Sequence, residues 1–257
     1  IRMVTPERDF AMRQFSCGVD SNKAASLKVP KLSTPLQAKN IAPRSSTEYT
    51  ARIAIETDFE FHQLFASTNA ATQYIADLLG YVSTVYSSEL QTHLQVGDVY
   101  LYNTHNDPWT AGTTHGALDE VSTYWQSNRA AVIRTLTHFL SGKNMAGGIA
   151  YMNTLCSTDY GYGVSGGLSG AFTPANPQII WDAVVVAHEL GHNFGSAHTH
   201  EYDNIGGNAS PVDCCAQGPG ACASQYGELP GVGSLTGGSI GGRNGSIMSY
   251  CHLLWGD

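Results

Sequence analysis

Apolar and polar residues alternate along several stretches of this chain, and a pattern with a period of two predicts β-strands. The first stretch is Tyr49–Glu56, and the second is Thr92–Tyr102. The second half of 131–140 and the apolar stretch Gly148–Leu155 predict two more strands. These predicted strands are spread through the middle of the chain.

Helical spacing separates these strands. Between Asn69 and Leu90, apolar residues recur every three or four positions, and His115–Asn128 has a similar pattern. A third helix is predicted at 181–194, where a run of apolar residues follows Trp181. Strands that alternate with helices predict an α/β fold with a mostly parallel sheet.

The two ends of the chain differ from this pattern. Residues 1–48 have weak periodicity and many loop-favouring prolines and serines, so we interpret them as a segment separate from a domain at 49–257. After His198 the chain is rich in Gly, Ser and Cys, which predicts a small irregular C-terminal part.

Composition narrows the range of partners. Only 13 of the 257 residues are Lys or Arg, the net charge is −8, and no basic cluster exists. Nucleic acid and anionic membrane surfaces are therefore not expected partners, because both require concentrated positive charge. No apolar run approaches the roughly 18–20 residues that span a bilayer. The chain begins at Ile1 without a signal-like segment, which we interpret as a processed or truncated piece.

The cysteines indicate an oxidising compartment. Their number is even, and no C-x-x-C spacing of a typical zinc site occurs. Disulfides, and therefore secretion, are the better interpretation. The six residues are Cys17, Cys156, Cys214, Cys215, Cys222 and Cys251.

A metal-binding pattern lies within and just after the third predicted helix. His188 and His192 are one helical turn apart, so both project from one face and can bind a single zinc ion. Glu189 can act as a general base without binding the metal. Gly195 can turn the chain sharply and return His198 as a third ligand. Three protein ligands leave one coordination position open, as in catalytic zinc sites.

A second motif, Ser246-Ile247-Met248-Ser249-Tyr250, follows about 50 residues after His198. Together the two motifs resemble those of the metzincin metallopeptidases, whose signature pairs a three-histidine motif with a Met-containing turn. The resemblance implies that Met248 forms an apolar floor beneath the zinc. The sequence around Met248 is most similar to serralysins and astacins, which implies that Tyr250 steadies the oxyanion in the transition state.

Other segments are similar to the reprolysin (adamalysin) group, namely Gly148–Cys156 and Tyr162–Ser165. Thr199 departs from this group, which usually carries Asp after the third histidine. The resemblance implies a metzincin fold with a twisted, mostly parallel five-stranded sheet, a zinc helix and an edge strand at Gly148–Asn153. It also implies a secreted, monomeric endopeptidase with one catalytic Zn²⁺ and a protein or peptide substrate.

The reprolysin resemblance also implies a disulfide between Cys156 and Cys251. Cys222 is then expected to pair with Cys214 or Cys215 across a short loop. One cysteine of the adjacent pair is left over, together with a cysteine near the N-terminus.

That N-terminal residue, Cys17, lies in Phe15-Ser16-Cys17-Gly18-Val19, which resembles the cysteine-switch segment of metzincin propeptides. The resemblance implies that 1–48 is a propeptide and that Cys17 is a fourth zinc ligand in a latent form only. The alternative is a disulfide between Cys17 and the leftover member of the Cys214-Cys215 pair.

Two questions stay open at this stage. A catalytically silent zinc-fold module for binding or adhesion is the alternative to an active peptidase, although retention of Glu189 favours catalysis. Structural calcium is possible but undetermined, because no D-x-[DN]-x-[DN]-G loop occurs.

Overall fold

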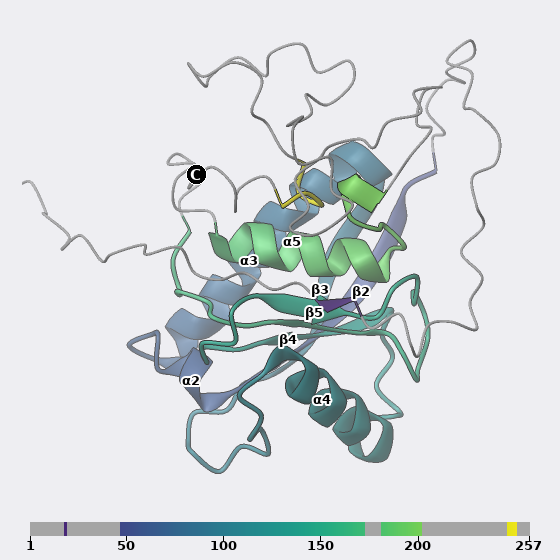
Figure 1. The fold of residues 1–257 in the computed structure, drawn as a ribbon. Coiled ribbons are helices and arrows are strands. Elements are labelled where there is room, and N and C mark those ends of the chain that lie inside the picture. Colours follow the sequence, from purple (N-terminus) through teal and green to yellow (C-terminus); the bar gives the residue numbers. More distant parts are fainter. Residues whose placement is uncertain (1–17, 20–46, 173–180, 202–245, 251–257) are drawn as a thin grey trace, which may run out of the picture.

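The computed structural model describes residues 18–19, 47–172, 181–201 and 246–250. A twisted sheet lies at its centre, with helices on both faces (Figure 1). The strands are β1 (Gly18–Val19), β2 (Tyr49–Thr57), β3 (Thr92–Tyr100), β4 (Leu136–Leu140), β5 (Gly148–Ala150) and β6 (Tyr162–Ser165). The helices are α2 (Phe59–His62), α3 (Thr68–Leu90), α4 (Thr114–Asn128), α5 (Trp181–Asn193) and the 3₁₀ turn η1 (Thr199–Glu201).

The strand order is β1-β5-β6-β4-β2-β3. β3, β2, β4 and β6 pair in parallel, whereas β5 is antiparallel to β6. The predicted mostly parallel α/β sheet of five strands is therefore confirmed for β2 to β6. The short strand β1 adds a sixth member, because it pairs with the outer edge of β5 and runs parallel to it.

The sheet separates two apolar cores. Ile53 and Ile55 of β2 pack in the core that contains α3 and α5, whereas Ala54 between them packs in the core that contains α4. This alternation follows from the pleat, since successive side chains of a strand point to opposite faces. Figure 1 shows the same arrangement, with α3 and α5 above the sheet and α4 below it.

Capping residues explain where the two long helices begin. Ser67 accepts a hydrogen bond from the Ala70 backbone N–H at the start of α3, and Thr113 does so from Gly116 at the start of α4. Each hydroxyl satisfies a backbone donor that has no partner within its helix. Gln91 then ends α3 in the left-handed conformation, with φ 52°, and turns the chain directly into β3.

Two strand predictions need correction. The strand expected at Gly148–Leu155 stops at Ala150, because Asn153 has φ 57° and the chain turns there. The edge strand expected to reach Asn153 is shorter for the same reason. The periodicity of the sequence also predicts no strand at Tyr162–Ser165, but these four residues form β6, buried between β4 and β5.

Within the part of the chain that the structure describes, no helix combines the length and the apolar character needed to cross a membrane.

Candidate metal centre

The helix α5 presents three of the predicted site residues at the middle of the molecule. His188 and His192 are 1% and 0% exposed, and Glu189 between them is 0% exposed. The helix contacts β5, β6 and α3, and eleven of its thirteen residues are buried. This burial agrees with the apolar sequence that leads into His188.

The C-terminal end of α5 returns the chain toward the histidines. Gly195 has φ 99°, its N–H donates to the His192 carbonyl at 2.8 Å, and the Ser196 N–H donates to the Gly191 carbonyl at 2.9 Å. These two bonds form a Schellman motif, for which a residue with positive φ is required. The sharp turn brings His198 back beside α5.

His188, His192 and His198 form one cluster. Each residue offers a ligand atom, and these atoms all lie within 4.8 Å of one another. The ring centroids are 4.8 Å apart for His188 and His192, and 4.7 Å apart for His192 and His198. His198 is also buried, with 5% exposure. Among the described residues, these three side chains are the ones that lie close enough together to hold a metal ion as a group of three His, Cys, Asp or Glu ligands.

Hydrogen bonds on the outer side of the cluster fix the orientation of the rings. His188 Nδ1 lies 2.7 Å from the Ile247 carbonyl, and His192 Nδ1 lies 2.7 Å from the Ser196 carbonyl. A carbonyl oxygen can only accept, so both Nδ1 atoms are donors, and Nε2 of each neutral ring carries a lone pair. This is the tautomer in which histidine binds a metal through Nε2.

The donor atoms fit a cation. His188 Nε2 and His192 Nε2 are 3.2 Å apart, so two lone pairs face each other across a buried space. Burial, and then the neighbouring His198, lowers the pKa of His192 to about 4, which disfavours a proton between the rings near neutral pH. A metal ion bound by both nitrogens removes this repulsion. Zinc suits three imidazole ligands, and nitrogen atoms at about 2.0–2.1 Å from one tetrahedral ion lie roughly 3.3 Å apart.

The third histidine has a carboxylate partner. Glu201 Oε2 accepts from the His198 backbone N–H at 2.9 Å and lies 3.1 Å from His198 Nδ1. A carboxylate on the outer nitrogen orients the ring and makes Nε2 a stronger ligand. Reprolysins usually have Asp at the position of Thr199. In this chain the carboxylate beside the third histidine comes instead from Glu201, two residues further along.

Asn193 attaches the end of α5 to the sheet. Its side-chain Nδ2 lies 2.8 Å from the Tyr151 carbonyl, 2.9 Å from the Tyr162 carbonyl and 3.2 Å from Thr154 Oγ1. In return, the backbone N–H groups of Asn153 and Thr154 donate to the His192 and Asn193 carbonyls, both at 2.9 Å. The loop after β5 therefore satisfies the last carbonyls of the zinc-motif helix, which have no partner within it.

The segment 246–250 lies against the histidine cluster. The Ser249 N–H donates to the Ser246 carbonyl at 3.0 Å, which closes a turn around Met248. Met248 Sδ lies 2.5 Å from the position that a Cβ at Gly191 would occupy, so the thioether packs directly on α5. The ring of Tyr250 lies 4.5 Å from that of His198 and 6.1 Å from that of His188.

Several predicted residues fall outside the described part of the chain. Cys17 and Cys251 are among them, so neither the predicted zinc-ligand role of Cys17 nor the Cys156–Cys251 disulfide is tested. Cys156 itself is exposed, and no second cysteine lies within the described residues.

Sequence reasoning missed the partners of the histidine rings. The Ser196 and Ile247 carbonyls are backbone groups, for which the residue type gives no signal. The contact with Glu201 could have been predicted from the sequence, because a carboxylate three residues after His198 can reach the His198 ring.

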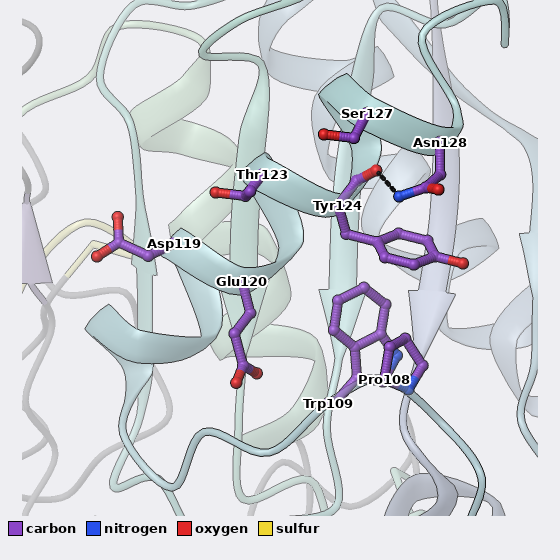
Figure 2. Close-up of a pocket in the computed structure, with 8 residues that line it drawn as sticks. All are labelled: Pro108, Trp109, Asp119, Glu120, Thr123, Tyr124, Ser127 and Asn128. Atoms are coloured by element: carbon purple, nitrogen blue, oxygen red, sulfur yellow. Dashed lines mark hydrogen bonds between the residues drawn. The ribbon is translucent and has the colours of Figure 1, made fainter.

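A pocket of about 490 Å³ contains none of these site residues in its lining, and Figure 2 shows the residues that do line it. Trp109 and Tyr124 form its aromatic wall, and Glu120 of α4 lies at its side. α4 covers the face of the sheet opposite α5, so this pocket does not belong to the candidate metal centre.

Comparisons with known proteins agree with the motifs. A reprolysin-type family model, described as metallo-peptidase family M12, matches residues 47–250. No curated protein matches the chain. One solved structure, "Structure of a chaperone-substrate complex", matches 62% of this chain and 25% of that chain, at 18% identity and a TM-score of 0.47. This chain spans about a quarter of that one, and the match is too distant to inform fold or function. The family match covers most of the chain, including both motifs, and the chain therefore belongs to metallo-peptidase family M12.

Proposed function

We propose that this chain is a secreted, zinc-dependent endopeptidase that hydrolyses internal peptide bonds of protein substrates. The observation that carries the proposal is the buried cluster of His188, His192 and His198, with Glu189 next to it on the same helix. A purely structural zinc site has four protein ligands and no use for a buried carboxylate beside them.

In this proposal the three histidines hold one zinc ion through their Nε2 atoms. When bound, zinc polarises the scissile carbonyl and makes water more acidic. Glu189 takes a proton from the attacking water and then delivers it to the leaving amine, because one carboxylate can act first as base and then as acid. Met248 supports the site from below through its packing on Gly191.

The sheet edge at β5 is the proposed position for the substrate backbone. An extended peptide can add to an exposed edge strand through main-chain hydrogen bonds. Support comes from the chain itself, because Gly18 and Val19 pair with Ile149 and Ala150 along this edge. We further propose that 1–48 is a propeptide, that 49–257 is the catalytic domain, and that β1 keeps the edge covered in the latent form.

Secretion and the Cys156–Cys251 disulfide also belong to the proposal. The even number of cysteines and the absence of C-x-x-C spacing support them. We propose that the chain acts as a monomer on protein or peptide substrates.

Metal removal tests the proposal. We expect a denatured protein substrate to be cleaved at internal bonds by the Cys17→Ala chain, and cleavage to stop after treatment with a zinc chelator. Stoichiometric zinc should restore it, because the ligand atoms of the three histidines already lie within 4.8 Å of one another. Fragment masses and the metal content are the measurements.

Cleavage that persists in the metal-free chain would contradict the zinc mechanism. Zinc binding without any cleavage would instead support a catalytically silent binding module.

Tyr250→Phe should lower kcat by about 10²–10³-fold with little change in KM. The phenol is proposed to donate a hydrogen bond to the oxyanion, and such a donor acts mainly in the transition state, where it is worth roughly 2.7–4 kcal/mol. Its ring position beside His198 supports this role. Steady-state kinetics of the Cys17→Ala chain on a fluorogenic peptide would measure the effect, with exposed Tyr49→Phe as the matched control. An unchanged kcat would reduce Tyr250 to a packing residue.

A further inference from the structure

Gly148 occupies a special position at the start of the edge strand. Its neighbour Ile149 packs in the core that contains α4. Because successive side chains of a strand point to opposite faces, a side chain at position 148 would point toward α5. The strand is held there by its antiparallel pairing, in which Gly148 lies opposite Ser165. The Gly166 N–H also donates to the Gly147 carbonyl at 2.8 Å, which fixes the chain just before the strand.

The side chain of Glu189 fills the space that a Cβ at residue 148 would need. An ideal Cβ there would lie 2.5 Å from Glu189 Cγ, 2.5 Å from Oε1 and 2.6 Å from Cδ. All three distances are far below normal carbon contacts of about 3.5–4.0 Å. The carboxyl-bearing end of Glu189 therefore lies against the backbone of the edge strand at Gly148, where any Cβ would overlap it.

The backbone on both sides of this contact is held in place. β5 is paired with β6, and the loop that follows it donates two N–H groups to the end of α5. α5 is held in turn by the bond from His188 Nδ1 to the Ile247 carbonyl. With both backbones fixed, a new side chain at 148 must move the carboxylate of Glu189, because its side-chain torsions are the softest degrees of freedom at the contact.

We propose that Gly148 is a positioning residue, whose missing side chain sets where the Glu189 carboxylate lies against the edge strand. This inference rests on the proposed general-base role of Glu189. Displacement by about 1 Å is enough to lower a rate about 100-fold when a catalytic group must meet its reactant in a defined geometry.

The test compares Gly148→Ala with Gly80→Ala, both in the Cys17→Ala chain. Gly80 is an exposed position of α3 with nothing within 4 Å of its missing Cβ, so it controls for glycine replacement as such. We expect Gly148→Ala to lower kcat about 100-fold, with KM changed less than about threefold. Zinc content should stay at one ion per chain, and Gly80→Ala should behave like the parent. A parent-like kcat in Gly148→Ala would overturn the proposal.

A second measurement separates this proposal from the function of Glu189. Glu189→Ala removes the three atoms that a Cβ at 148 would meet. The loss of thermal stability caused by Gly148→Ala should therefore disappear in the Glu189→Ala background, since two residues in contact do not act additively.

Equal losses of melting temperature in both backgrounds would overturn the proposal. If Gly148→Ala alone fails to fold, a double variant that also fails to fold would likewise overturn the proposal. Full activity in Glu189→Ala would show that Glu189 is not the general base. The comparison of melting temperatures in the two backgrounds would still show whether Gly148 sets the position of the Glu189 side chain.

Discussion

In the Cys17→Ala chain, replacing Glu189 with Ala should lower kcat/KM by about 10²–10⁴-fold, the contribution that a positioned general base and acid typically makes. The zinc content should remain one ion per chain, because the carboxylate is not among the three clustered ligands. The fold should also persist, since the change removes atoms from a contact with Gly148 and leaves the histidine hydrogen bonds intact. Peptide hydrolysis, metal analysis and thermal unfolding would measure these three expectations.

Glu89→Ala is the matched control, because Glu89 is an exposed carboxylate on α3. It should hydrolyse peptides at the parent rate. Turnover in Glu189→Ala close to that of the control would rule out Glu189 as the base. Loss of zinc together with activity would mean that the residue acts on the metal site rather than on water.

Cys17→Ala should raise the activity of the unprocessed chain by more than about tenfold. In the latent form, the proposed thiolate ligand and the strand β1 together cover the centre and the edge of the site. β1 by itself pairs only two residues with β5, so it should be a weak inhibitor without the thiolate. A tenfold change corresponds to about 1.4 kcal/mol.

Ser16→Ala is the control for this change, because it alters the neighbouring position without touching the thiol. Initial rates of peptide cleavage, measured before any processing of the chain, are the readout. Mapping of Cys17 to a disulfide, or no gain of activity in Cys17→Ala, would make 1–48 a structural extension instead of an inhibitor.

The zinc-motif helix was predictable because its signals are local. The spacing of His188 and His192 requires a helix, and Gly195 followed by His198 requires a sharp turn after it. The structure has α5 at Trp181–Asn193 and a positive φ at Gly195. Periodicity also found β2, α3 and α4 to within one residue at each end, since long amphipathic elements carry many consistent signals.

Other features depend on contacts between distant parts of the chain. β6 has four residues with a glycine among them, so its sequence contains too little periodicity to predict a strand, and burial between β4 and β5 decides its conformation. The bond from His188 to the Ile247 carbonyl joins residues that are 59 positions apart. Likewise, nothing in the sequence of Gly148 indicates that Glu189 lies on its backbone.

The capping of α5 by the loop after β5 has a consequence for protein engineering. The eleven residues from His188 to His198 contain all three histidines, so one would expect that grafting them onto another helix transfers the metal site. Yet the last carbonyls of that helix are satisfied by Asn153 and Thr154, and the amide of Asn193 reaches back to three oxygen atoms of the same region. A graft that omits 151–154 would leave buried polar groups without partners, each at a cost of about 1–3 kcal/mol. A transplantable unit must therefore include at least the helix, the hairpin of β5 and β6, and the segment 246–250 whose Ile247 carbonyl orients His188.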